Sequence, residues 1–175
     1  MIATPALWVA FAAMLPLMAW ASWSDLRTLK IPNTLVLAVL AVFVVTGIWG
    51  LPTDVFFWRL GHGFAILMLG FIAFSFGFIG GGDAKMAAAL TPFIVPSDLS
   101  LFLILYAVVT LVLLMVLRLV MQMYRHRDTG WLSIDQLKKP AKERVFPMGL
   151  IFGVAMVLYL GMYVLKAAGL WPEPA

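Results

Sequence analysis

The stretch "LGHGFAILMLGFIAFSFGFIGGG" (residues 60–82) contains no Asp, Glu, Lys or Arg. A helix needs about 20 apolar residues to cross the hydrocarbon core of a bilayer, so this stretch is long enough to do so. Further charge-free intervals occupy residues 1–24, 31–53, 86–97, 99–117 and 145–165. They are continuous apolar runs without the alternation of a strand, and only helices or closed barrels can span lipid. The sequence therefore predicts an all-α fold, a polytopic membrane helix bundle.

The composition agrees with this class, because 64% of the 175 residues are hydrophobic and only 11% are charged. There are no cysteines, which excludes disulfides and thiolate metal sites. His62 and His126 are far apart in the chain and adjoin no cluster of carboxylates, so we expect no metal and no cofactor. Membrane topology explains the net charge of +4 better than nucleic acid does, so we expect no nucleic acid partner.

The distribution of Lys and Arg predicts the topology, since these residues concentrate in cytoplasmic loops. No Lys or Arg precedes Arg27, so residues 1–21 are predicted to be a first membrane helix rather than a signal peptide. With six spans and the N-terminus outside, only Arg59 and Lys166 fall in outside loops. We therefore expect six transmembrane helices, both termini outside, and one domain over residues 1–175 with a large cytoplasmic loop at about 118–145.

The fourth apolar interval is the shortest and contains Pro92. An apolar stretch of this length can also be re-entrant. If it did not cross, however, the basic loop at 118–145 would face outward, against the charge bias. We predict a short span that begins near Asp83, with a water-accessible recess on the cytoplasmic side supplying the missing length.

Two aspartates end charge-free intervals on the same side of the predicted membrane. Asp25 ends the first interval and Asp83 ends the third, and two helices between them take the chain out and back. Ionisable groups at membrane depth are costly and usually functional. Two neighbouring carboxylates can hold one proton between them. The ionised one can then take a proton from an attacking water while the other donates to a peptide carbonyl.

Plainer readings of these residues remain open at this point. Asp83 could be an ordinary helix N-cap behind a glycine hinge, and Asp25 a solvated residue paired with Arg27. Gly80 and Gly82 lack a Cβ, so backbone can approach closely there. Phosphate binding by this glycine run is disfavoured, because Walker spacing is missing and the adjacent carboxylate would repel phosphate.

The residues around both aspartates resemble a known family. Gly80-Gly81-Gly82-Asp83 matches the GxGD motif of intramembrane aspartyl proteases, and "GGGDAKM" (residues 80–86) resembles type IV prepilin peptidases. Asp25 precedes Ile31-Pro32-Asn33, which is similar to the first catalytic site of that family. "VFPMGLIFGVAM" (residues 145–156) resembles the Pro-x-Gly start of its last helix. The resemblance covers nearly the whole chain.

This resemblance implies a membrane aspartic endopeptidase with Asp25 and Asp83 as catalytic residues. Its substrate would be a prepilin or preflagellin-like protein, cleaved after a leader glycine at the cytoplasmic face of the cell membrane. The chain is similar to the minimal CpaA/TadV-like branch of Flp/Tad pilus systems or to preflagellin peptidases. We expect no methylation of the product, because the sequence shows no recognisable S-adenosylmethionine site.

Further residues are expected to support the site: Gly80, Gly82, Lys85, Pro32, Asn33, Pro147 and Gly149. Lys85 could orient the motif or be ordinary positive-inside charge. Gly149 and Gly153 form a GxxxG pattern, which favours close helix packing over direct catalysis. Residues 131–146 could form an amphipathic helix that contacts anionic lipid headgroups, or be a solvated basic loop.

Two rival functions use the same aspartates. One is a non-enzymatic membrane transporter or pilus-assembly factor with a proton-carrying Asp pair. The other is a pseudo-protease that binds prepilins without cutting them. Peptide cleavage by the purified protein separates both from a peptidase.

Overall fold

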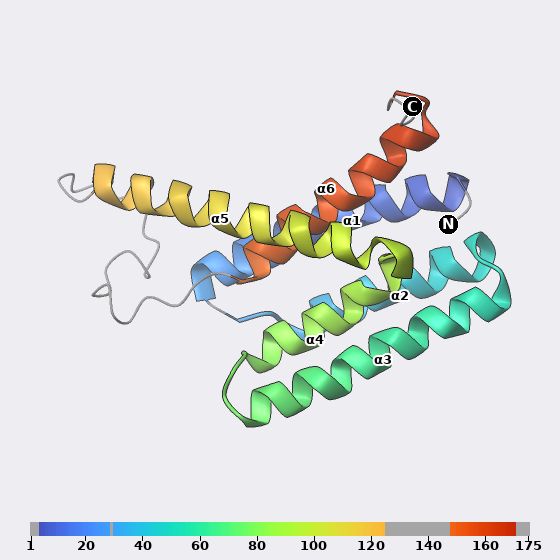
Figure 1. Cartoon of the computed structure of the whole chain (residues 1–175), viewed down its shortest axis with the longest axis horizontal. Coiled ribbons are helices and arrows are strands. Elements are labelled where there is room, and N and C mark those ends of the chain that lie inside the picture. Colours follow the sequence, from blue (N-terminus) through green and yellow to red (C-terminus); the bar gives the residue numbers. More distant parts are fainter. Residues whose placement is uncertain (1–3, 29, 125–147, 171–175) are drawn as a thin grey trace.

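The computed structural model describes residues 4–28, 30–124 and 148–170, and all regular structure in these ranges is helical (Figure 1). The α-helices are α1 (Thr4–Thr28), α2 (Asn33–Gly50), α3 (Thr53–Ser75), α4 (Gly81–Leu90), α5 (Leu99–Tyr124) and α6 (Met148–Ala167). Two 3-10 turns, η1 (Thr91–Phe93) and η2 (Pro96–Asp98), join α4 to α5. The predicted all-α class is confirmed.

Five segments are long and apolar enough to cross a membrane, namely α1, α2, α3, Pro96–Val116 and α6. At ten residues, or about 15 Å of helix, α4 is not among them. Five candidate spans are therefore supported, and a sixth crossing stays a prediction.

The chain reverses direction at each connection between helices. The start of α1 and the end of α6 therefore lie at the same end of the molecule (Figure 1). We call the end where α1 finishes and α2, α4 and α6 begin the aspartate end. Which end faces the cytoplasm stays a prediction.

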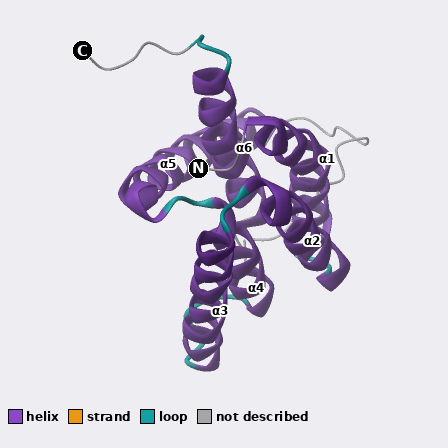
Figure 2. Cartoon of the chain, turned by 90° about the vertical axis from the view of Figure 1, so that its right-hand side faces the viewer, coloured by secondary structure: helices purple, strands orange, loops and turns teal. Residues whose placement is uncertain are grey.

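The most extensive helix contacts are those of α1 with α6, of α3 with α4, and of α1 with α2. In the view along the helices, α3 and α4 form one arm, while α6 lies between α1 and α5 (Figure 2). The core beneath these helices includes stacked aromatic rings. The ring of Phe43 in α2 stacks on Phe56 of α3 at 5.7 Å and meets Phe93 of η1 edge-on at 5.3 Å. The short turn after α4 is thereby fixed to α2 and α3.

Glycines of α3 set its register against α4. A Cβ at Gly70 would lie 2.9 Å from Cβ of Ala84, and one at Gly63 would lie 3.0 Å from Cγ of Pro92. Near the aspartate end, a Cβ at Gly81 would lie 3.3 Å from the Phe74 ring. Thus α4 begins level with the end of α3 but stops opposite Gly63, and α3 extends beyond it.

The length missing from α4 therefore falls at the end away from Asp83. Arg59 bonds Pro92 in η1, just after α4, and residues 53–58 of α3 extend past this point for about 9 Å of helix. The water-accessible recess expected on the cytoplasmic side stays a prediction, as does the side itself. Pro92 and Pro96 lie in the connection, and proline cannot donate the backbone hydrogen bonds that would continue the helix.

Two other boundaries differ from expectation. Arg59, expected in an outside loop, lies inside α3 with a buried side chain, because it donates to a backbone carbonyl there. Residues 118–124, expected in the cytoplasmic loop, are the last residues of α5, which continues to Tyr124. The rest of that loop, Pro147 and the candidate amphipathic helix lie outside the described residues.

The contact between α3 and α4 can be tested with two glycines of the same helix. We expect Gly70→Ala to lower the free energy of unfolding by about 1–3 kcal/mol, because its Cβ would overlap Ala84 and separate the helices. Thermal unfolding of the purified protein in detergent measures this change.

Gly61→Ala is the matched control, because a Cβ at Gly61 meets nothing within 4 Å. It should leave stability unchanged or raise it by up to about 1 kcal/mol through helix propensity. Equal effects of the two substitutions would contradict the register described above.

Candidate active site

Asp25 lies in the last turns of α1 and is 5% exposed. The backbone N–H of Gly149 donates to its Oδ2 at 2.6 Å, and the N–H of Leu150 also donates to the carboxylate. These N–H groups belong to the first turn of α6, where the helix itself offers them no acceptor and carries partial positive charge. The start of α6 thus binds Asp25 directly.

The surroundings of Asp25 exclude the alternative that it is a solvated surface residue paired with Arg27. A solvated carboxylate paired with Arg27 would be exposed, but Asp25 is buried and the Arg27 guanidinium instead lies 4.1 Å from the ring centroid of Trp23. A Cβ at Gly149 would lie 3.0 Å from Cβ of Asp25. Only glycine at this position lets α6 approach the carboxylate so closely.

Asp83 lies in the first turn of α4, three residues after the N-cap. The N-cap is Gly80, so the expectation that Asp83 itself is a simple N-cap is wrong. The Asp83 carboxylate turns back and accepts a hydrogen bond from the N–H of Gly80, as the third residue of a capping box does. A Cβ at Gly80 would lie 2.6 Å from Oδ2 of Asp83, so a side chain there would displace the carboxylate.

The two carboxylates interact through their charges. Burial, followed by the negative charge of Asp25, raises the pKa of Asp83, and the hydrogen bond from Gly80 opposes this shift. Asp83 belongs to α4, which is not one of the candidate spans. It therefore keeps its proton at a higher pH than an ordinary aspartate does.

The start of α4 is also tied to the connection between α1 and α2. Nζ of Lys85 donates to Oδ1 of Asn33 at 3.2 Å, and a Cβ at Gly82 would lie 3.5 Å from Cβ of Ile31. Pro32 is the N-cap of α2, and its carbonyl accepts from the first turn of that helix. These predicted supporting residues thus join the segments that carry Asp25 and Asp83.

The glycines of the predicted GxxxG pattern pack against α1. Gly149 and Gly153 both face α1, where a Cβ at Gly153 would lie 3.1 Å from the carbonyl oxygen of Met18. The close packing expected of the GxxxG pattern is therefore present. Pro147 lies outside the described residues.

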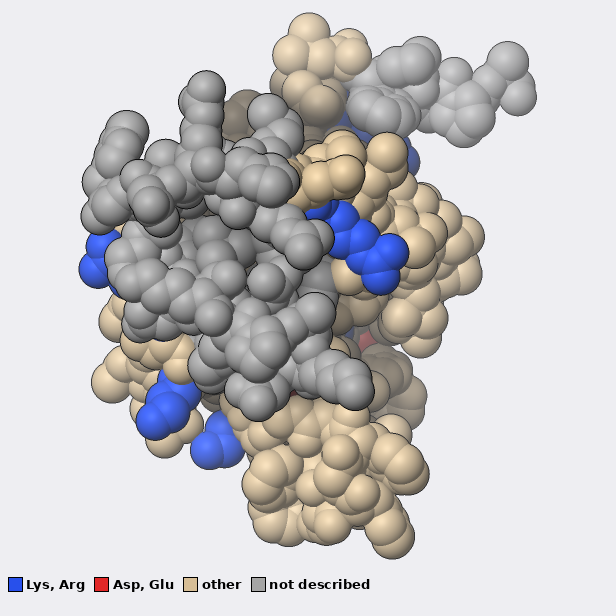
Figure 3. All heavy atoms as spheres, turned by 90° about the vertical axis from the view of Figure 1, so that its left-hand side faces the viewer, with Lys and Arg blue, Asp and Glu red and all other residues tan. Residues whose placement is uncertain are grey.

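The face at the aspartate end carries positive charge. Figure 3 views this end and shows Lys and Arg side chains of the described residues around its edge. The described basic residues of this end are Arg27, Lys30, Lys85 and Arg118. Such a bias is typical of the cytoplasmic side of a membrane protein.

One residue near the site carried no sequence signal. The ring of Tyr106 in α5 packs on Phe152 of α6 at 5.2 Å, about one turn after Gly149, which contacts Asp25. A single tyrosine in an apolar helix reads as lipid-facing or packing surface, so only the fold identifies it. Among the described residues, no cluster of three or more His, Cys, Asp or Glu could hold a metal ion.

A buried and a half-buried carboxylate, the second directly after a glycine run, lie at one end of an apolar helix bundle and define a candidate membrane aspartic peptidase. The sequence model of the type IV leader peptidase family matches residues 12–116, more than half of the chain and including both aspartates. The chain belongs to this family, whose members are aspartic-type prepilin peptidases. No curated protein and no solved structure shows significant similarity to it.

The contact between α6 and Asp25 predicts a sharp effect of a single methyl group. We expect Gly149→Ala to reduce prepilin cleavage about 10–100-fold, because the added Cβ would displace the Asp25 carboxylate from the N–H groups at the start of α6. The rate of leader removal by the purified variant measures this loss.

Gly161→Ala is the control on the same helix, since its Cβ would make ordinary contact with Phe11 of α1 at 3.7 Å. It should cleave at the rate of the unchanged protein. If Gly149→Ala were equally active, the position of Asp25 against α6 would be irrelevant to cleavage.

Proposed function

We propose that this peptidase removes the leader of an Flp/Tad-type prepilin at the cytoplasmic membrane face, with Asp25 and Asp83 as its catalytic dyad. Family membership supplies the reaction, which is leader-peptide cleavage of prepilin-like substrates. The observation that carries the choice of residues is the action of the Asp25 charge on Asp83, across the junction of α1, α4 and α6. The narrower substrate class rests on the resemblance to the minimal branch.

The surroundings of the two carboxylates suggest different roles for them. Asp25 receives backbone N–H groups from the start of α6, which stabilise a negative charge. The raised pKa of Asp83 favours a proton on that carboxyl. We therefore assign Asp25 as the general base and Asp83 as the general acid.

The reaction then proceeds in two balanced steps. Asp25 takes a proton from water as the water oxygen bonds to the scissile carbonyl carbon, and Asp83 donates its proton to the carbonyl oxygen. In the resulting gem-diol, the C–N bond breaks and the leaving amine takes the proton from Asp25. One hydroxyl of the gem-diol returns a proton to Asp83, which restores both carboxyls.

The glycines beside the dyad support access for an extended substrate. Gly80 is exposed, and Gly81 and Gly82 are half-buried, so peptide backbone can approach the carboxylates without meeting a side chain from these positions. The positive face at the aspartate end supports a cytoplasmic position for the site. Membrane lipids surround the apolar helices, and we propose no methyltransferase activity.

Replacing either carboxyl by an amide tests the dyad. We expect Asp25→Asn and Asp83→Asn each to reduce cleavage about 10²–10⁴-fold, because each removes one proton-transfer group. A co-expressed Flp-type prepilin reports this as a mobility shift, and sequencing of the new N-terminus reports cleavage after the leader glycine.

Asp54→Asn serves as the matched control, since Asp54 is exposed in the first turn of α3, at the opposite end of the bundle. All three variants should insert into the membrane equally. Normal cleavage by either dyad variant would remove that residue from the mechanism. Cleavage of other type IV prepilins but not of an Flp-type one would overturn only the substrate class.

The raised pKa of Asp83 also predicts the pH dependence of the reaction. The general acid is active while protonated, so kcat/KM should fall as pH rises through the raised pKa. This decline should lie above about pH 4, where an ordinary aspartic acid already loses its proton. Initial cleavage rates of purified protein across pH give the profile, and a rate that only rises with pH would exclude this role for Asp83.

A further inference from the structure

Arg59 is a buried charge that the peptidase mechanism does not use. It lies within the candidate span α3 and is 3% exposed. Its Nη1 donates to the carbonyl oxygen of Pro92 at 3.3 Å, while its buried Nε has no acceptor among the described residues. The charge of Asp98, in the turn before α5, acts on Arg59, but no carboxylate among the described residues bonds the guanidinium directly. A buried charge without a directly bonded partner is costly, so a ligand anion would stabilise it.

The carboxylate of the neighbouring turn has other partners. Oδ2 of Asp98 accepts a hydrogen bond from the Tyr159 hydroxyl at 3.3 Å, and Oδ1 accepts from the Ser97 hydroxyl at 3.1 Å. The Tyr159 hydroxyl in turn accepts from the N–H of Val95 at 3.0 Å. No ion pair joins Arg59 to a carboxylate within the part of the chain that the structure describes.

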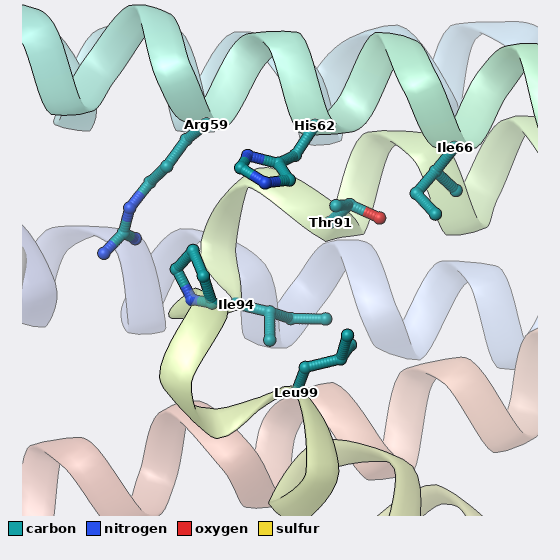
Figure 4. A pocket seen from close by; sticks show the side chains of 7 residues that line it. Arg59, His62, Ile66, Thr91, Ile94 and Leu99 are labelled. Atoms are coloured by element: carbon teal, nitrogen blue, oxygen red, sulfur yellow. The ribbon is translucent and has the colours of Figure 1, made fainter.

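A cavity of about 150 Å³, lined in part by the Arg59 side chain, lies between α3 and the turn that follows α4. This is roughly the liquid volume of five water molecules, enough for a phosphate group. Figure 4 shows Arg59 and His62 reaching from α3 toward the turn. The polar residues of the wall are Arg59, His62 and Thr91, and its apolar residues include Ile66, Ile94 and Leu99.

Hydrogen bonding determines which wall groups can donate to a ligand. Nδ1 of His62 bonds the carbonyl of Trp58 at 2.9 Å, so it carries a hydrogen, and Nε2 is the atom available to a ligand. The Thr91 hydroxyl donates to the carbonyl of Ala87 at 2.8 Å, so it cannot donate elsewhere. The available donors are therefore the Arg59 guanidinium and, when protonated, Nε2 of His62.

The depth of the cavity suits a lipid headgroup. Because α4 stops early, its polar connection to α5 lies about 9 Å along the helix from the start of α3 at Thr53. Ser97 is exposed in this connection, and Leu99 of the cavity wall is 53% exposed on the outer surface of the bundle. A polar group can enter beside the turn while an apolar chain lies along Leu99 and Ile66.

We propose that this cavity binds a phosphate group, with the guanidinium of Arg59 as its principal donor. Guanidinium groups pair with phosphate through two parallel hydrogen bonds, and Arg59 has donors left after its bond to Pro92. The phosphate can belong to a phospholipid headgroup or be free in solution. The site lies at the opposite end from the dyad and does not depend on the proposed catalytic roles.

Thermal unfolding of delipidated protein in detergent tests the site with three ligands. These are phosphatidylglycerol, diacylglycerol with the same acyl chains, and inorganic phosphate. At about 100 times its Kd, a phosphate ligand should raise the unfolding midpoint by about 5–10 °C, while diacylglycerol should not. A shift with phosphatidylglycerol alone assigns the phosphate to lipid, and an equal shift with inorganic phosphate assigns it to the free ion.

Arg59→Gln should lose the shift, because it removes the charge but keeps a donor for the Pro92 carbonyl. Lys166→Gln should keep it, since Lys166 is an exposed cation at the same end of the bundle and controls for nonspecific attraction. Asp25→Asn should also keep it, which separates this test from that of the dyad.

Ile66→Trp provides a second variant, which fills the cavity and leaves Arg59 in place. It decides the question if Arg59→Gln does not fold, and it too should lose the shift. The proposal is overturned if no phosphate compound stabilises the unchanged protein. It is also overturned if diacylglycerol acts as well as phosphatidylglycerol, or if a folded Arg59→Gln or Ile66→Trp variant retains the shift.

Discussion

The hydrogen bond from the start of α6 to Asp25 is the contact on which the site depends. A carboxylate buried at the end of a membrane helix needs donors, and the free N–H groups of a helix start are the ones at hand. The bond forms only because Gly149 has no side chain between the two helices. One small residue thus fixes both the packing of α6 on α1 and the surroundings of Asp25.

Asp83 reaches the same place by a different route, through the packing of α4 on α3. The close contacts of Gly63 and Gly70 bring α4 against α3 with its first turn at the aspartate end. Lys85 then bonds Asn33 at the start of α2. Two helix pairs that pack largely independently therefore bring their carboxylates together where α1, α2, α4 and α6 meet.

The sequence could predict that the two aspartates share one end of the bundle, because this follows from counting reversals of the chain, but not that their carboxylates lie close together. Asp25 and Asp83 lie two crossings apart, so they share one end of the bundle whatever the details of packing. The charge distribution failed to place Arg59. A rule that assigns basic residues to loops takes no account of a buried carbonyl that becomes free where a neighbouring helix breaks. The position of the break depends on the α3–α4 register, which leaves no mark in hydropathy.

A helix as short as α4 is stable within an apolar bundle only if both of its ends are bonded by protein. Lipid offers no hydrogen bonds to free backbone groups, so a turn at membrane depth must find its partners internally. Arg59 supplies a donor to Pro92, and Tyr159 supplies an acceptor to Val95. Arg59 is itself only partly paired, and the cavity that we propose binds phosphate lies beside it. The short α4 thus carries Asp83 in its first turn at the aspartate end and leaves the cavity beside Arg59 where it stops.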